Sequence, residues 1–567
     1  MKRPVVLLAA CIGLWVPGAC GGSGGNGIDA IAVPDPGPDR PGEEVRDVPT
    51  ADFPDGAPED LPDRDPGAEG PADTPPEAAQ DTEAGPDAGD PGPGDVPGGD
   101  EGPFVRPQAG DPVPPEELAA VTDLYLDLMA RLGWFDLLDE RVHGYPDGVA
   151  PGRPGYGTWW SGVRILKENG QVRYLHSADG ADNNGLRTAP MLAGVAFALA
   201  LRDDPDRVRL AGRIVRGFQS WILAMERSSV PDAPVLMTRA SYPESVVWTV
   251  RGTEVRIDYS LNRPGLDNGA CQYVHLQDNP WWGDLYVKNK RSKDDIGHLL
   301  LAIALADPLL RDHPDLRQDW DRMMDLYRRW ARQVEDDGWH IGTWDQDLNL
   351  WYPEDDLAFY LMDINGFDPE CTIALATRLM GRGDEGTLDC GNGITFLDDA
   401  VSMKPSNAQM LRSYHEAAIA QARLNGRQGI LGPLLEGLAR RLDAIFDPPP
   451  DGSGPPRPSD EDLAELVIMS HAVGVPSTWR EARFFHDRVR EAHGAYLRPE
   501  NLALLHPLDP ETPDGQYPFD PAGAGIAFRY LGAALGACAS PFRDPGSVPL
   551  LDCDRVRSAF SAAPAYH

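Results

Sequence analysis

Apolar side chains recur three and four residues apart through most of the chain after residue 115, which is the spacing of amphipathic helices. Pro115 opens the first of these stretches, and Leu118, Val121, Leu124 and Leu128 then share one helix face. The same spacing predicts further helices over residues 187–201, 206–227, 293–306, 315–336, 355–363, 369–379, 406–424, 428–446, 460–473, 479–493 and 522–537. An all-α domain is therefore expected.

Few segments of the sequence have the pattern of a β-strand. Residues 163–166 with 172–175, and residues 246–250 with 254–259, read as two short hairpins. Long loops rich in Trp and Asp connect the helices. This order is typical of an array of helical hairpins. We expect an (α/α) toroid, or incomplete helical barrel, of about ten to twelve helices with minor β-hairpins and with its function in the loops.

The N-terminus has the order of an export signal. Lys2 and Arg3 precede an apolar run from Val5 to Val16, and Pro17-Gly18-Ala19-Cys20 and a Gly/Ser string follow. The run is too short to span a bilayer permanently. It resembles a bacterial lipoprotein signal, although Pro17 replaces the usual aliphatic residue. Residues 1–20 are therefore predicted to direct export, with Cys20 lipidated and the protein anchored at the outer membrane or cell surface.

Residues 21–112 consist mainly of Pro, Gly, Asp, Glu and Ala, a composition that is typical of a disordered tether. The chain of 567 residues carries a net charge of −38, and about half of that charge falls on this segment. No basic patch is apparent, so nucleic acid is a poor partner. Residues 113–567 are expected to form the helical domain, whose oligomeric state the sequence leaves open.

The cysteines can form disulfide bonds, as is expected in an exported protein. Of the seven in the chain, Cys371 with Cys390 and Cys538 with Cys553 enclose loop-like sequence and are natural disulfide pairs, and Cys271 is left over. No zinc signature occurs, so neither a metal nor another cofactor is expected. A weaker alternative is a calcium ion shared by Asp179, Asp182 and Asp284, because oxygen-rich loops suit a hard cation.

Two junctions between a loop and an apolar helix concentrate polar side chains. The first is His176-Ser177-Ala178-Asp179-Gly180-Ala181-Asp182-Asn183-Asn184-Gly185-Leu186-Arg187-Thr188, and the second is Trp281-Trp282-Gly283-Asp284 followed by Arg291-Ser292-Lys293-Asp294-Asp295-Ile296-Gly297-His298. Both resemble segments at helix starts in bacterial extracellular proteins of the carbohydrate-active (α/α) toroid type. Asn184, Arg187 and Asp295 depart from that pattern. The resemblance implies the fold more than a reaction, because toroids host hydrolases, lyases, epimerases and non-enzymes.

Asp and Asn at a helix start are first of all expected to cap it. The two junctions hold more polar groups than caps require, however, and a carboxylate from each could lie across a sugar ring as a glycosidase needs. Under this hypothesis Asp182 pairs with Asp294 or Asp295, and His298 and Arg187 orient the pair. A polysaccharide lyase would instead use Asn183 and Arg187 with His176, Tyr414 or His415.

Paired aromatic side chains beside polar groups suggest surfaces on which sugars stack. Trp281 and Trp282 are the first candidates, although loop tryptophans often fold back onto a core. The expected substrate-binding set is His176, Asn183, Arg187, Trp281, Trp282, Asp284, Arg291, His340, Trp344, Tyr414 and His415. For His415, a bond to Glu416 or to the backbone is the simpler alternative. Residues 352–356 read as an acidic helix start.

Two interpretations of the function follow. The first is a surface-tethered enzyme that acts on an external polysaccharide, a glycoside hydrolase or a lyase. The second is a non-catalytic lipoprotein that binds glycan or protein through the same groove.

Overall fold

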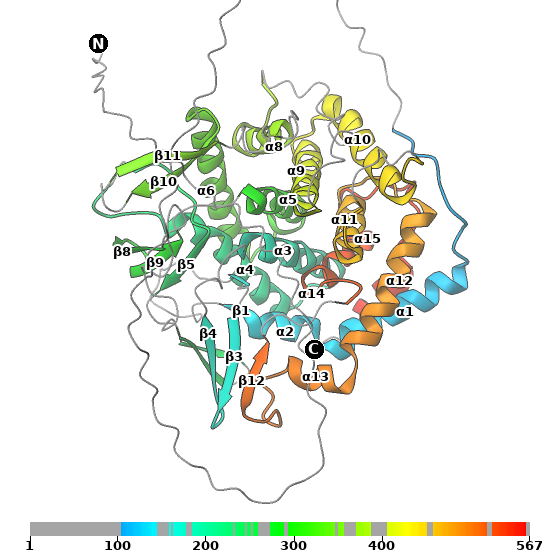
Figure 1. The fold of residues 1–567 in the computed structure, drawn as a ribbon, viewed down its shortest axis with the longest axis horizontal. Coiled ribbons are helices and arrows are strands. Elements are labelled where there is room, and N and C mark those ends of the chain that lie inside the picture. The colour runs from blue at the N-terminus through cyan, green and yellow to red at the C-terminus, as the bar shows by residue number, and fades with distance from the viewer. Residues whose placement is uncertain are drawn as a thin grey trace, which may run out of the picture. The chain divides into compact units, whose positions relative to one another are not determined.

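The computed structural model describes residues 104–143, 158–159, 163–176, 184–230, 233–243, 247–250, 253–258, 273–288, 293–345, 350–356, 370–386, 405–450, 457–518 and 524–562 (Figure 1). They belong to one compact unit, of which Gly102–His567 is a part; a second unit, Gly24–Glu101, lies wholly outside the described residues. The predicted signal, the lipidation site Cys20 and most of the predicted tether also lie outside them.

The described part of the chain is mostly helical, which confirms the all-α prediction at that level. The helices are α1 (Pro115–Leu132), α2 (Trp134–Arg141), α3 (Asn184–Leu201), α4 (Pro205–Leu223), α5 (Lys293–Leu310), α6 (Arg317–Asp336), α8 (Glu370–Arg382), α9 (Pro405–Leu424), α10 (Gln428–Phe446), α11 (Asp460–Ala472), α12 (Trp479–Tyr496), α13 (Pro499–Leu505), α14 (Phe528–Leu531), α15 (Gly536–Ala539) and α16 (Cys553–Ser561). A 3₁₀ turn, η3 (Ala533–Leu535), separates α14 from α15.

Local signals set several helix boundaries. Gly133 ends α1 in the left-handed conformation, at φ 61°. Asp204 caps α4 by accepting the N–H of Arg207, and Thr478 with Glu481 forms a capping box at α12. The helix predicted over 522–537 is wrong as one element, because the structure breaks that stretch into α14, η3 and α15.

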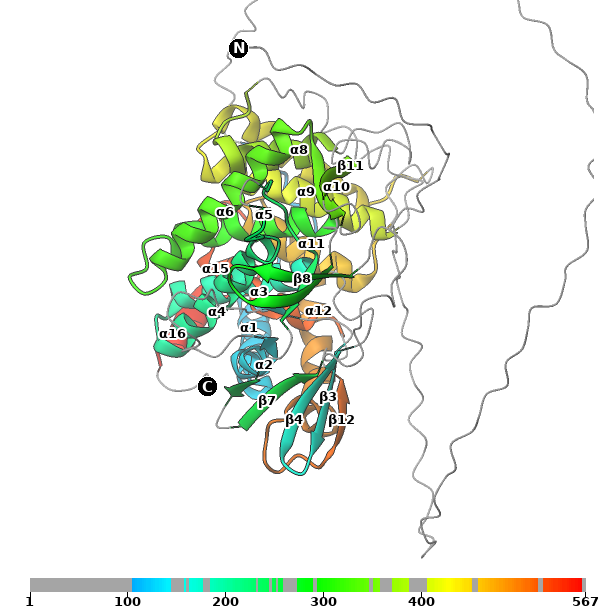
Figure 2. The same ribbon diagram turned by 90° about the vertical axis from the view of Figure 1, so that its left-hand side faces the viewer.

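Both predicted hairpins are present. β3 (Val163–Glu168) pairs antiparallel with β4 (Gln171–His176), and β6 (Val247–Val250) pairs antiparallel with β7 (Thr253–Asp258). A parallel pairing of β4 with β7 joins the hairpins, and β12 (Gly515–Pro518) adds to β3, giving the order β12-β3-β4-β7-β6. Figure 2 shows β3, β4, β7 and β12 gathered at one end of the folded unit, away from α8 and α9.

Further strands were not predicted. β5 (Ala240–Pro243), β8 (Tyr273–Asn279) and β9 (Gly283–Lys288) form a three-stranded sheet, and β1 (Val142–His143) pairs with β2 (Thr158–Trp159). β10 (His340–Asp345) pairs with β11 (Leu350–Asp356). The helix start expected at residues 352–356 is therefore wrong, because pairing with β10 holds this segment extended. Pro353, which lacks an N–H, lies opposite Gly342 where the register shifts.

α3 occupies the centre of the helical packing. It contacts α4, α5, α14 and α15, and Figure 1 shows it among these neighbours. α5 packs against α9, α9 against α8, α10 and α11, and α11 against α12 and α15. Among the described helices, α3 is the one whose length and hydropathy would allow it to cross a membrane, but 78% of it is buried inside the unit. Its apolar composition therefore fits a core helix.

The segment before α1 is fastened to the helices. Arg106 is buried and donates to Glu481 at 2.6 Å and to Asp443 at 2.7 Å, and the N–H of Arg480 donates to the carbonyl of Ala109. The folded unit thus already includes residues ahead of the expected boundary at 113. These residues belong to the folded unit because buried Arg106 pairs with carboxylates of α10 and α12.

One predicted disulfide lies within the described residues. Cys538 of α15 and Cys553 of α16 are joined, with an S–S distance of 2.15 Å. Cys390 and the side chain of Cys371 lie outside the described part, so their pairing stays a prediction.

Candidate functional site

The two sequence junctions meet in the fold. The Oδ1 atom of Asp295, in the first turn of α5, accepts the N–H of Leu186, in the first turn of α3, at 2.7 Å. Asp295 is fully buried. The first N–H groups of a helix lack partners within that helix, and this carboxylate supplies one from a neighbouring helix. Asp295 therefore caps α3, which favours a positioning role over the catalytic role expected from the sequence.

α9 lies against the same turn of α5. An added Cβ on Gly297 would stand 2.6 Å from Ser413 Oγ and from Tyr414 Cδ1, so glycine is needed for this close approach. His298, one residue further on, is only 3% exposed, and Tyr414 is 2% exposed. Both side chains therefore lie inside the helical packing, which corrects the expected contact of Tyr414 with substrate; the orienting role of His298 stays a prediction.

His415 is part of the core as well. It is fully buried, and its Nε2 lies 2.9 Å from the carbonyl oxygen of Leu434 in α10. Burial, aided by the charge of Arg441, lowers the pKa of His415 from 6.5 to about 3, so the ring stays neutral. His415 thus makes the bond to the backbone that the sequence offered as the simpler alternative. Its expected contact with substrate is wrong, because the side chain is fully buried.

A buried cluster of charges links α9, α11 and α14. Arg412 Nη2 lies 3.2 Å from Glu465 Oε2, and Arg529 Nη2 lies 2.7 Å from Glu465 Oε1. Arg412 also donates through Nη1 to the carbonyl of Asp462 at 2.8 Å, and its Nη2 lies 3.4 Å from Tyr530 Oη. Arg412 and Glu465 are at most 2% exposed. These bonds fix the first turns of α11 and α14 against the middle of α9.

Glu416 extends the cluster inward. Its Oε1 accepts from Ser470 Oγ at 3.2 Å, and its Oε2 lies 3.9 Å from Arg412 Nε. Burial raises the pKa of Glu416 from 4.5 to about 8, and the charge of Arg412 opposes that rise. The carboxyl is therefore largely protonated at neutral pH.

Glu461 lies at the half-exposed edge of the same cluster, in the first turn of α11. Burial raises the pKa of its carboxyl, and the charges of Arg529 and Arg187 act on it in the opposite direction. Arg187 belongs to the first sequence junction and is partly exposed. A carboxyl with a raised pKa that water can still reach has the character of a general acid.

Sequence reasoning missed Glu461. It stands in the run Ser459-Asp460-Glu461-Asp462, where Ser459 accepts the N–H of Asp462 as an ordinary helix cap. Acidic residues in the first turn of a helix are common because they favour its dipole. The sequence therefore carries no signal that separates Glu461 from its neighbours.

The tryptophan pair lies in a turn that folds back toward the core. Trp282 is 8% exposed. The indole Nε1 of Trp281 donates to Glu226 at 2.6 Å, and the guanidinium of Arg322 covers its ring at 4.5 Å from the ring centre. Asn279 accepts both backbone N–H groups of the pair, each at 3.0 Å, and so folds this turn back onto the core. The stacking hypothesis is therefore wrong for buried Trp282, and for partly exposed Trp281 it stays a prediction.

Several predicted site residues cannot be assigned positions. Asp179, Asp182, Asn183 and Arg291 lie outside the described residues, as do the side chains of His176, Asp284, Asp294, His340 and Trp344. Within the described ranges, no group of three or more His, Cys, Asp or Glu side chains could hold a metal ion. The calcium alternative involves only residues whose side chains lie outside those ranges.

Comparisons with known proteins returned nothing: no protein-family model matches this chain, and no curated protein or solved structure matches it.

Proposed function

We propose that the folded unit is an (α/α) toroid whose inner helices are α3, α5, α9, α11 and the α14–α15 segment. Pairwise packing supports this arrangement, because each of these helices contacts the next and α15 and α14 return to α3. α4, α8, α10 and α12 pack against them as the second layer, and α6 packs against α4 and α8 within that layer.

The inner helices also run in the same direction. Leu186 of α3 meets Asp295 of α5 near their N-termini, and Arg412 of α9 reaches Asp462 of α11. Arg529 of α14 meets Glu465 of α11. The starts of α3 and α5 thus lie together, and the starts of α11 and α14 lie together against the middle of α9.

On this fold we propose a surface-anchored enzyme that hydrolyses an external polysaccharide. Two observations carry it: Glu461 is a half-buried carboxyl whose pKa is raised by burial, against the opposing charge of Arg187 from the first junction, and a hydrogen bond joins the helix starts of the two junctions. Hydrolysis of a glycosidic bond needs one protonated carboxyl that donates its proton to the leaving oxygen, and one carboxylate that activates water or attacks the sugar.

In this mechanism Glu461 is the general acid, and Asp182, two residues before α3, is the partner carboxylate. Asp295 is a positioning residue, because its bond to Leu186 N fixes the start of α3. Arg187 and Arg529 limit the rise in the pKa of Glu461 and so keep its proton transferable. The acidic segment before the domain serves as a spacer toward a polymer too large to diffuse to the membrane.

The test is a screen of the full chain against a polysaccharide panel, with reducing ends as the readout. Glu461→Gln is expected to lower kcat by about 100-fold or more, because general acid catalysis contributes roughly 10²–10⁴-fold. It should also abolish the alkaline limb of the pH–rate profile. Asp182→Asn should lose activity with an unchanged melting temperature.

Glu500→Gln is the matched control, since Glu500 is exposed on α13 and remote in sequence from the junctions. It should retain full activity. Equal activity in Glu461→Gln and the control, with the pH profile unchanged, would exclude Glu461 as the acid.

A polysaccharide lyase is the second candidate. The cations Arg187 and Arg529 both act on Glu461, and such a pair could neutralise a uronate carboxylate. A lyase would release a product that absorbs in the ultraviolet from uronate polymers and not from neutral glycans. Saturable binding of a glycan without any turnover would instead establish a non-catalytic glycan-binding lipoprotein.

A further inference from the structure

The cation that acts most strongly on Glu461 is Arg529, and a different carboxylate holds it. Nη2 of Arg529 lies 2.7 Å from Oε1 of Glu465, and its guanidinium lies 5.4 Å from the centre of the Tyr530 ring. The second oxygen of Glu465 lies 3.2 Å from Nη2 of Arg412. Glu465, which is fully buried, therefore holds two arginines at once.

Glu461 and Glu465 are four residues apart on α11, so their side chains are neighbours on one face of the helix. Within the described ranges, however, Glu461 forms no ion pair. Arg488 of α12 pairs with Asp460 instead, at 3.1 Å. Arg529 thus has two carboxyls within one helical turn and is bonded to the buried one.

Four charged groups act on the carboxyl of Glu461. Burial raises its pKa, and the carboxylates of Glu465 and Asp462 add to that rise. Arg529 of α14 and Arg187 of α3 oppose it. A guanidinium that paired directly with Glu461 would lower this pKa by about 1–3 pH units. The carboxyl would then be ionised at neutral pH and could not give a proton to a leaving oxygen.

Burial explains why Arg529 stays with Glu465. A fully buried carboxylate that loses its cation is strongly destabilising. Water and salt screen the partly exposed carboxyl of Glu461, so it gains less from a cation. The pair of Arg529 with Glu465 is therefore the more favourable one.

We propose that Glu465 is a positioning residue that keeps Arg529 away from Glu461, so that Glu461 retains the proton that hydrolysis needs. This inference rests on the function proposed above, because it concerns Glu461 as the general acid. Loss of Glu465 should release Arg529 onto Glu461, whereas loss of Arg529 should remove a cation from its surroundings. The two substitutions therefore act on Glu461 in opposite directions.

Infrared titration of the full chain tests the proposal without a substrate. The band of the protonated Glu461 carboxyl is followed with pH after subtraction of the spectrum of the matching Glu461→Gln protein. In Glu465→Gln its midpoint should fall by about one pH unit or more, and in Arg529→Met it should rise. Glu465→Asp, which keeps the charge but has a shorter reach, should also lower the midpoint and replaces Glu465→Gln if that variant does not fold.

A double variant separates positioning from the charge of Glu465 itself. In the Arg529→Met background, Glu465→Gln should move the midpoint less than half as far as it does in the unmodified chain, because no Arg529 is left to hold. Where a polysaccharide is hydrolysed, the alkaline limb of the pH–rate profile should move with the same midpoints.

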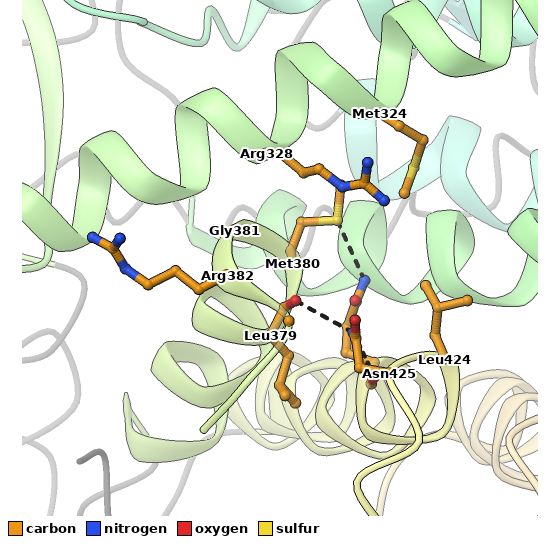
Figure 3. Close-up of a pocket in the computed structure, with 10 residues that line it drawn as sticks. Met324, Arg328, Leu379, Met380, Gly381, Arg382, Leu424 and Asn425 are labelled. Atoms are coloured by element: carbon orange, nitrogen blue, oxygen red, sulfur yellow. Dashed lines mark hydrogen bonds between the residues drawn. The ribbon is translucent and has the colours of Figure 1, made fainter. Parts of the chain in front are cut away.

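Glu335→Gln is the matched control. Glu335 of α6 likewise pairs with two arginines, Arg378 and Arg382 of α8, the second at 2.6 Å. Figure 3 shows this part of the fold, with Arg382 pointing away from the cavity that α6, α8 and α9 line. Loss of this carboxylate should leave the midpoint of Glu461 unchanged.

The inference would be overturned by no shift in either single variant, by shifts in the same direction, or by an equal effect of Glu465→Gln with and without Arg529. An equal shift in the Glu335→Gln control would overturn it as well. Failure of the proposed function is a separate outcome: a panel without any hydrolysed polysaccharide would refute the enzyme, whereas the infrared midpoints decide the role of Glu465.

Discussion

At the scale of single residues, burial separates the roles that the sequence left open. Asp295 and His415 are fully buried and bond to backbone groups of neighbouring helices, so they hold the fold. Glu461 is half-buried and keeps access to water. Residue type identified Asp295 and His415 as candidates and missed Glu461, because the accessibility of a side chain depends on what packs against it.

A substitution of Arg412 tests how much the buried charge cluster contributes to stability. It lies between Glu465 and Glu416, and all three side chains are buried. Arg412→Met should lower the free energy of unfolding by about 3–5 kcal/mol, because it removes a cation from the buried carboxylate of Glu465. Urea denaturation followed by circular dichroism measures the change.

Arg440→Met is the matched control for that experiment. Arg440 forms an exposed pair with Glu436 at 3.9 Å on α10, and such surface pairs contribute about 0–1 kcal/mol. A similar loss in both variants would contradict the proposed contribution of the buried cluster.

At the scale of elements, helical periodicity located most helices, and α10 spans the predicted residues 428–446. It did not locate β10 and β11, because each strand is held by the other and neither alternates clearly by itself. Periodicity also could not show that α3 and α14 approach closely. Gly194 provides for this approach, since a Cβ there would lie 2.7 Å from the backbone carbon of Gly532.

Gly194→Ala should therefore destabilise the fold by about 1–3 kcal/mol, the usual result of overpacking a core. Thermal and urea unfolding give the value. Gly494→Ala, at an exposed position of α12 with nothing within 4 Å of the added Cβ, should stabilise by about 0.5–1 kcal/mol, because alanine has the higher helix propensity. If both substitutions stabilised the protein, the close packing of α3 on α14 would be refuted.

At the scale of the whole molecule, the ionisable groups in the interior set the pH range of stability. Burial lowers the pKa of His415 from 6.5 to about 3 and that of His471 from 6.5 to about 4. Below pH 6.5 these two histidines bind protons in the unfolded chain but not in the fold, so the free energy of unfolding falls with falling pH. Glu416 acts in the opposite direction, since its pKa is raised from 4.5 to about 8.

We therefore expect the free energy of unfolding to be highest near pH 6.5 and to fall by about 1.4 kcal/mol per pH unit between pH 6.5 and 8, where Glu416 keeps its proton in the fold but not in the unfolded chain. Glu416→Gln should flatten this alkaline limb and steepen the acid limb, because Glu416 opposes the two histidines between pH 4.5 and 6.5. Denaturation curves at a series of pH values provide the measurement. An alkaline limb that persists in the variant would show that other groups cause it.

The sequence by itself determined that this chain is mostly helical, where most helices begin and end, and that polar residues concentrate at the starts of α3 and α5. Those properties follow from local periodicity, capping residues and glycine. Only the tertiary structure decided that Asp295 caps α3, that Trp282, Tyr414 and His415 are buried, and that Glu461 shares an electrostatic environment with Arg187. These properties depend on contacts between segments more than a hundred residues apart in several cases, and burial and pKa arise from such contacts rather than from residue type.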